Sequence, residues 1–192
     1  MARLREFNEM TAIKAIESLF WEKGYEGTSY ADLTKATGLG KGSLYAAFGN
    51  KKSLYIKALD NYIMREVEAL GSLMIQNYED DPTKWRDCLI YFFNVAIDAV
   101  HQRQDRRGCF LCNAAVDLAP FDKDVEATVM KALAKVKSAL AVVLKENFTD
   151  EKQEAIIESI LAAYLWHARN GESRCHAKTT NFGARHNNCV FK

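Results

Sequence analysis

The sequence predicts an all-helical fold in which three short N-terminal helices are followed by a larger helical body. Three observations support this prediction. Apolar residues recur at helical spacing along most of the chain. Only 2 prolines and 10 glycines occur in 192 residues, too few for the frequent turns of a β protein. Helix-capping residues stand immediately before most of the periodic segments.

The first predicted helix covers residues 12–20 and ends at Gly24, with a lysine in its last turn. Ile16 and Phe20 mark its apolar side, and Glu17 and Glu22 are expected on the other side. This helix is therefore expected to pack with one face against the rest of the chain.

Two short helices follow. The first begins at Ser29, where Ser29 and Asp32 have the spacing of a capping signal, and Gly38 ends it. The second covers residues 40–48. Two short helices joined by a glycine-containing turn form the minimal helix-turn-helix, here residues 29–48. Its internal core is expected to consist of Leu33, Ala36, Leu39, Leu44 and Phe48.

Longer helices are predicted for the rest of the chain. One is expected to run without a break from Asn50 to about Gln76, and Asp81-Pro82 opens another that reaches about Arg103. A short apolar helix follows at 109–118. Asp122 then caps a long helix, and the last helix covers 150–168.

These elements predict two domains with a boundary near residue 60. Residues 1–60 form the N-terminal unit and residues 61–170 form the helical body. The segment 171–192 has no amphipathic period, so we expect an irregular tail there.

The second helix of the helix-turn-helix has a small outward face, which consists of Gly42, Ser43, Ala46 and Ala47. Small side chains let a helix backbone enter the major groove of DNA deeply. Lys41 and Tyr45 flank this face, and Lys51 follows at the start of the next helix, where they can reach phosphates or base edges. Residues 33–59 contain five lysines and no acidic residue, which favours an anionic partner.

An alternative interpretation of residues 40–43 is a flexible loop or a phosphate cradle. A P-loop needs a longer glycine spacing after a strand, and no strand is predicted before this segment. The helical interpretation is therefore favoured.

Residues 7–60 resemble the DNA-binding domain of the TetR-like transcriptional regulators. The resemblance is carried by Gly24-Tyr25, Thr28-Ser29, Asp32-Leu33, Ala36, Gly38-Leu39, Lys41-Gly42-Ser43-Leu44-Tyr45, Phe48 and Asn50-Lys51-Lys52-Ser53-Leu54. It implies a homodimer that binds double-stranded DNA at a palindromic operator, usually as a repressor, and releases it when a small-molecule effector enters the C-terminal domain. It also implies phosphate contacts for Tyr30, Lys41, Tyr45 and Lys51, and base contacts for Gly42, Ser43, Ala46 and Ala47.

Two features depart from the family pattern. Gly40 stands where the family more often has a serine as helix cap. Family members usually end in two long helices that form the dimer interface, and 171–192 lacks the apolar stripe of the second one. Whether this tail takes part in the dimer interface stays open.

Cys109 and Cys112 form a C-x-x-C motif, and the chain has no second such motif to complete a zinc site. A thiol at a helix N-terminus has a lowered pKa and can act as a redox sensor. Because the two thiols stand at i and i+3 of a predicted helix, a disulfide between them is expected to need local distortion. The alternative is that both cysteines are small buried hydrophobes on a packing helix.

Several residues of the body are candidates to line an effector cavity between helices. They are Phe92, Cys112, Asn113, Phe121, Tyr164, Trp166 and His167. The alternative places the aromatic residues in the ordinary core and makes His167 a hydrogen-bonded core or interface histidine.

No catalytic motif is found, so we expect neither an enzyme nor a metal site or cofactor. The N-terminus does not resemble a signal peptide, and the longest apolar runs are about half of a membrane span. A cytoplasmic protein with reduced cysteines is expected. Two rival interpretations are a small helical ligand carrier or enzyme with a structural N-terminal unit, and a helical interaction adaptor.

Overall fold

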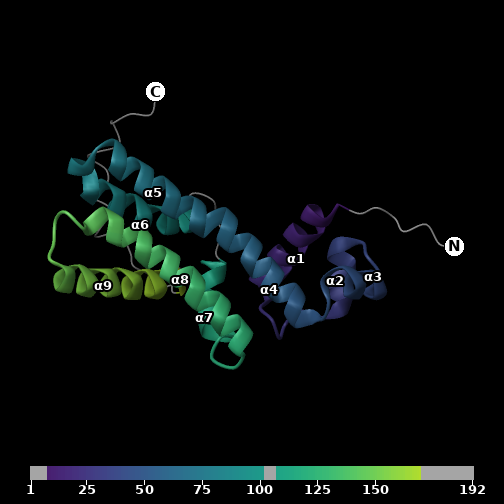
Figure 1. The fold of residues 1–192 in the computed structure, drawn as a ribbon. Helices are drawn as coiled ribbons and strands as arrows, with labels where there is room; N and C mark the ends of the chain where they lie inside the picture. Colours follow the sequence, from purple (N-terminus) through teal and green to yellow (C-terminus); the bar gives the residue numbers. More distant parts are fainter. Residues whose placement is uncertain (1–7, 102–106, 170–192) are drawn as a thin grey trace.

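A computed structural model describes residues 8–101 and 107–169, and the side chains of all of these except 96–101 and 167–169. In this part of the chain every regular element is a helix. Figure 1 shows a small N-terminal group of helices joined to a larger body by one long helical rod. The predicted all-helical class is confirmed.

The N-terminal group contains three helices. They are α1 (Glu9–Lys23), α2 (Tyr30–Thr37) and α3 (Lys41–Phe48). The capping box of α2 forms as predicted, because the Ser29 hydroxyl accepts from the backbone N–H of Asp32 while the Asp32 carboxylate accepts from that of Ser29. Gly38 ends α2 in the left-handed conformation, with φ of 70°. Gly40 precedes α3 and supplies no side-chain cap.

The rod consists of α4 (Lys51–Tyr62), a π-helical segment (Ile63–Glu68) and α5 (Ala69–Asp80). The prediction of one unbroken α-helix here was wrong. A π-helix adds a residue to each turn, so the faces of α4 and α5 are offset from each other. The side chain of Asn50 caps the rod by accepting from the backbone N–H of Ser53 at 2.9 Å.

The body is built from the remaining helices. A 3₁₀ turn (Pro82–Lys84) leads into α6 (Trp85–His101), and α7 (Phe110–Asp117), α8 (Lys123–Leu144) and α9 (Asp150–Arg169) follow. Asp81 and Asp122 cap their helices with their side chains, as predicted. The predicted irregular tail, 171–192, lies outside the described residues.

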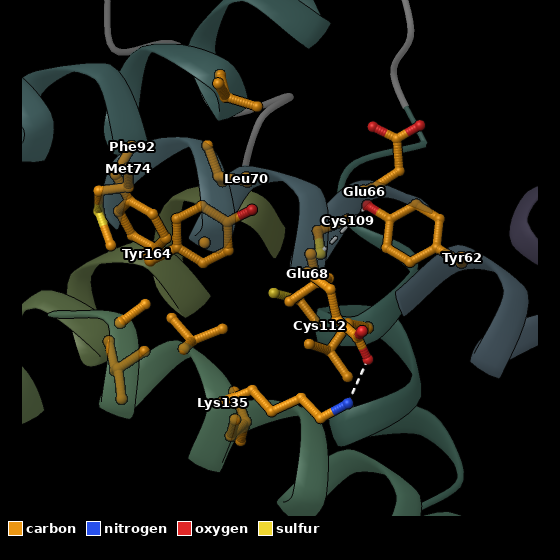
Figure 2. A pocket seen from close by; sticks show the side chains of 18 of the residues that line it. Tyr62, Glu66, Glu68, Leu70, Met74, Phe92, Cys109, Cys112, Lys135 and Tyr164 are labelled. Atoms are coloured by element: carbon orange, nitrogen blue, oxygen red, sulfur yellow. Dashed lines mark hydrogen bonds and ion pairs between the residues drawn. The ribbon is translucent and has the colours of Figure 1, made fainter. Parts of the chain in front are cut away.

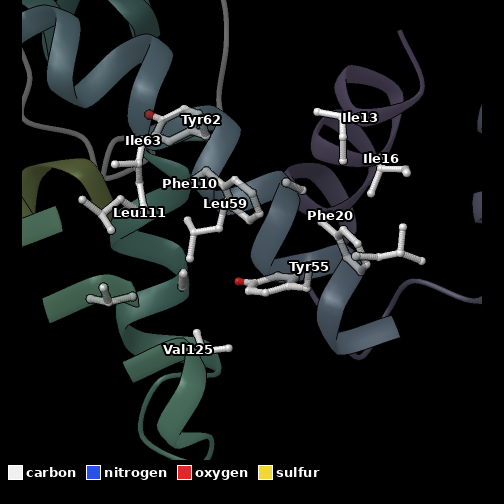
Figure 3. Close-up of a cluster of buried hydrophobic side chains, with 14 of the residues drawn as sticks. Ile13, Ile16, Phe20, Tyr55, Leu59, Tyr62, Ile63, Phe110, Leu111 and Val125 are labelled. Carbon is white, nitrogen blue, oxygen red and sulfur yellow. The ribbon is translucent and has the colours of Figure 1, made fainter. Parts of the chain in front are cut away.

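Two hydrophobic cores hold the described helices together. The first joins α1, α2, α3 and α4 to α7 and the start of α8, with Phe20, Tyr55, Leu59 and Phe110 among its members (Figure 3). The second joins α5, α6, α8 and α9. Because the first core continues from the N-terminal helices into α7, the domain boundary near residue 60 stays a prediction.

One member of the predicted helix-turn-helix core differs from expectation. Leu33, Leu44 and Phe48 are buried and Leu39 is half-buried, but Ala36 is exposed. The larger side chains fill the angle between α2 and α3, so the core is complete without the alanine.

Candidate nucleic-acid interface and effector cavity

The outward face of α3 is exposed and narrow. Gly42, Ser43 and Ala46 are exposed and Ala47 is half-buried. Leu44 and Phe48 are buried against the other helices of the N-terminal group, which is called the head from here on. No atom lies within 4 Å of the position that a Cβ of Gly42 would take. Because its side chains are small, a surface can approach the backbone of α3 closely.

The four predicted phosphate-contacting residues lie together beside this face. The rings of Tyr30 and Tyr45 stack with centroids 6.1 Å apart, and the ammonium of Lys41 lies 4.8 Å from the centroid of Tyr30. The backbone of Lys51 lies close enough to the Tyr30 hydroxyl to lower its pKa slightly. Burial raises the pKa of Tyr30, and the neighbouring Tyr45 raises it further. This hydroxyl therefore stays protonated at neutral pH.

The lysines of this region have different partners. Lys51 lies 4.4 Å from the ring centroid of Tyr25, and among the described residues no carboxylate is within ion-pair distance of Lys41 or Lys51. Lys52 instead pairs with Asp124 at 2.6 Å and with Asp122 at 3.3 Å. Lys41 and Lys51 can thus meet an anionic partner, while Lys52 holds the start of α4 against α8.

A cavity of about 480 Å³ lies where the two hydrophobic cores meet. Its wall is mainly apolar and includes Leu70, Met74 and Phe92 from the body. The π-helical segment supplies part of the wall through Arg65 to Glu68, and Lys135 of α8 forms an ion pair with Glu68 there (Figure 2). Cavities of this size and character hold small molecules.

Two thiols and two phenols converge on this cavity. Cys109 and Cys112 are buried in its wall, and the Tyr62 hydroxyl donates to the sulfur of Cys109 at 3.5 Å (Figure 2). Interaction with the Cys112 side chain and the hydrogen bond from the Tyr62 hydroxyl lower the pKa of the Cys109 thiol, against the effect of burial. The hydrogen bond with Cys109, together with burial, raises the pKa of Cys112.

The structure brings some of the predicted pocket residues into this wall and leaves others outside it. Phe92, Cys112 and Tyr164 line the cavity, and the rings of Phe92 and Tyr164 lie 4.7 Å apart. Asn113 does not line it, because its amide donates to the carbonyl of Arg107 at 2.9 Å. The side chain of His167 lies outside the described residues.

Two aromatic predictions for this pocket were wrong. Phe121 belongs to the turn between α7 and α8, and 84% of it is exposed. Trp166 of α9 is 56% exposed and is not part of the cavity wall. The placement of both follows from helix orientation and turn geometry, which residue type alone does not indicate.

A buried carboxylate joins the head to the cavity wall. Glu17 was expected on the solvent side of α1, but it is 3% exposed. Its oxygens accept from the side-chain amide of Asn61 at 2.5 Å and from the guanidinium of Arg65 at 2.7 Å. Arg65 in turn lines the cavity. The sequence signal is the spacing of Ile13, Ile16, Glu17 and Phe20, which places Glu17 within the apolar stripe.

The described part of the chain contains neither a membrane-spanning helix nor a group of metal-ligating side chains. Within residues 8–101 and 107–169, no helix combines the length and apolar character needed to cross a membrane. No three of the described histidines, cysteines and acidic residues are grouped as metal ligands would be.

Comparison with known proteins identifies the N-terminal unit. Residues 12–58 match the family model described as bacterial regulatory proteins, tetR family. Residues 12–58 thus form a domain of the TetR family. The TetR-family match covers α2 and α3 completely and includes most of α1 and α4.

The chain is also similar to curated regulators and solved structures over a longer stretch. The HTH-type transcriptional repressor ComR of Escherichia coli (strain K12) is 32% identical over 127 residues, which are 66% of this chain and 59% of ComR. The structure of a TetR regulatory protein from Rhodobacter sphaeroides has a TM-score of 0.71 at 21% identity and covers 85% of this chain and 87% of its own. At this identity the likeness shows the fold.

A further structure shows a TetR-family protein on its target. It is the regulator CifR, with substituted cysteines, in complex with 26 base pairs of double-stranded operator DNA. Its TM-score is 0.68 at 23% identity, and the match covers 88% of this chain and 90% of CifR. The chain spans about 60% of the length of the first curated relatives that it matches.

Proposed function

We propose that the protein is a dimeric, cytoplasmic, non-catalytic repressor that binds a palindromic operator and leaves it when an effector occupies the cavity. The observation that carries this proposal is the narrow, exposed face of α3 beside Tyr30, Lys41, Tyr45 and Lys51. The TetR-family match of residues 12–58 and the repressor function of ComR support it.

In this proposal α3 is the recognition helix. The major groove is about 12 Å wide and just admits a helix, so Gly42, Ser43, Ala46 and Ala47 would face the base edges. Lys41 and Lys51 would contact phosphates on either side, with the N-terminus of α4 adding backbone N–H donors. Two such helices in a dimer would enter successive major grooves about 34 Å apart.

The test is replacement of Tyr45 and Lys51 together by alanine. Duplexes selected from a random library by the wild-type protein serve as the probe, and affinity is measured across a range of salt concentrations. We expect weaker binding. The slope of log affinity against log salt concentration should also be smaller by about 1, because one cation that neutralises a phosphate, Lys51, is lost. The matched control replaces Tyr91 and Lys84, an exposed tyrosine and lysine of the body, by alanine.

Each outcome of this test is informative. Equal affinity and slope in the two double variants would refute the assignment of the interface. A wild-type protein that retains no duplex but binds small apolar molecules would favour the ligand carrier instead. Circular dichroism of each variant checks that the helices are intact.

The cavity is the proposed effector site. Its apolar wall, with a few thiol and phenol groups at one end, suits a small, mainly apolar molecule with one polar or thiol-reactive group. An occupant would touch the π-helical segment and Arg65, and Arg65 contacts Glu17 of α1. Occupancy would thereby bias the angle between the head and the body, and such coupling between sites is typically about 1–3 kcal/mol.

A further inference from the structure

Of the two cysteines of the cavity wall, only Cys112 lies within a regular helix. Cys109 precedes α7 as its N-cap and has an extended backbone, with φ of −100° and ψ of 123°. Cys112 lies in the first turn, both side chains line the same cavity, and each thiol shifts the pKa of the other. The sequence predicted that a disulfide between these cysteines would distort the chain, on the assumption that both residues are helical. As an N-cap, Cys109 has a non-helical backbone, so that expectation does not apply to it.

The surroundings give the two sulfurs different chemistry. The sulfur of Cys109 accepts a hydrogen bond from the Tyr62 hydroxyl at 3.5 Å, which stabilises a thiolate. Cys112 donates toward Cys109 and holds its own proton more tightly. Cys109 is therefore the nucleophile of the pair, and Cys112 is the thiol positioned to attack it after oxidation.

We propose that Cys109 and Cys112 form a reversible redox modification site that closes to an intramolecular disulfide when a small peroxide enters the cavity. The Cys109 thiolate attacks one oxygen of hydrogen peroxide, the O–O bond breaks, and hydroxide leaves with a sulfenic acid on Cys109. The Cys112 sulfur then attacks the sulfur of Cys109, and the sulfenic oxygen leaves as water. Two thiols lose two electrons in total, and one peroxide is reduced to two water molecules.

Formation of the disulfide changes the contacts of Tyr62 at the end of α4. Tyr62 is the last residue of α4, immediately before the π-helical segment, and its hydroxyl donates to Cys109 in the reduced protein. A disulfide sulfur is a much weaker acceptor than a thiolate. Oxidation therefore weakens the hold of α7 on the end of α4. An effect of this change on DNA rests on the proposed function, but the disulfide itself does not.

The test uses the full-length protein, reduced and then exposed to hydrogen peroxide. Mass spectrometry should show a loss of 2 hydrogens, about 2 Da, and peptide mapping should place the bond between Cys109 and Cys112. A thiol reductant should restore the original mass. In Cys112→Ser the reaction should stop at a sulfenic acid on Cys109 that dimedone traps, and in Cys109→Ser the peroxide should leave Cys112 reduced.

Two controls keep the result interpretable. Cys88→Ser removes a thiol that is buried in the second core, and it should leave the disulfide unchanged. Mapping of the wild-type protein decides the question even where a variant folds poorly. A disulfide elsewhere, or peroxide-treated protein with both thiols of the motif free, overturns the inference. Because the readout is mass, loss of DNA binding cannot imitate either result.

Discussion

The buried carboxylate of Glu17 offers the sharpest test of how the head is attached to the cavity. The guanidinium of Arg65 contacts two carboxylates, Glu17 at 2.7 Å and Glu66 at 3.2 Å. The side chain of Glu17 is 4% exposed, and that of Glu66 is 41% exposed. The same cation thus takes part in one ion pair with a buried carboxylate and one exposed pair.

The expected magnitudes differ accordingly. Removal of one partner of a fully buried pair costs about 3–5 kcal/mol. The side chain of Arg65 is 40% exposed and Asn61 still donates to Glu17, so we expect Arg65→Met to lower the free energy of unfolding by about 1–3 kcal/mol. The coupling energy of Glu17 with Arg65 should be about 1–2 kcal/mol. That of Glu66 with Arg65 should be below about 0.5 kcal/mol.

The assay is urea unfolding at one fixed protein concentration, because a dimer's stability depends on concentration. Two double-mutant cycles are compared, Glu17→Gln with Arg65→Met and Glu66→Gln with Arg65→Met. The second cycle is the matched control, since it removes the same cation from a solvent-exposed partner. A Glu17 coupling no larger than the Glu66 coupling would refute the reasoning from burial.

Three further predictions address the head and the thiol pair. Gly42→Ala should raise the melting temperature, because its Cβ meets no atom within 4 Å and alanine favours a helix by up to about 1 kcal/mol; it should also weaken operator binding, and an unchanged affinity would show that Gly42 does not approach DNA. The rate of Cys109 alkylation by iodoacetamide should level off at a lower pH than that of free cysteine, because the pKa of its thiol is lowered; a rate that rises with pH in parallel with that of free cysteine would contradict this. Lys23 and then Ser29 hold the pKa of Asp32 below its ordinary value of 3.8. Asp32→Asn should therefore destabilise the protein at pH 7, and the difference from wild type should shrink steadily as the pH falls below about 4, because the unfolded state then takes up the proton that the folded state still excludes. A difference that stays constant from about pH 4 down to the acid limit of folding would count against that cause.

Local chemistry explains why the head could be predicted from the sequence. The capping box of Ser29, the left-handed Gly38 and the cap at Asn50 each depend on residues a few positions apart, and all three formed as expected. The four predicted phosphate-contacting residues lie together beside α3 for a similar reason, because α2 and α3 are short and the turn between them is fixed.

Long-range contacts explain what could not be predicted. The spacing of the apolar residues places Glu17 on the buried face of α1, but its partners lie 44 and 48 residues away and no local pattern reveals them. The π-helical segment inserts extra residues into a rod whose apolar spacing stays helical, so the periodicity does not show the break. Sequence periodicity indicates which face of each helix is buried, but it does not indicate how completely the buried side chains fill the space between helices. The cavity could therefore not be predicted.

The continuity of the first hydrophobic core has a practical consequence for protein engineering. Because Phe110 of α7 packs on Trp21, Tyr55 and Tyr62, a reading head cut at residue 60 would leave aromatic rings without their cover. A chimaera that joins this head to the effector-binding domain of another protein must therefore include α7, or an aromatic side chain that takes the place of Phe110. The interchangeable unit is defined by this packing, and it is not a single stretch of chain.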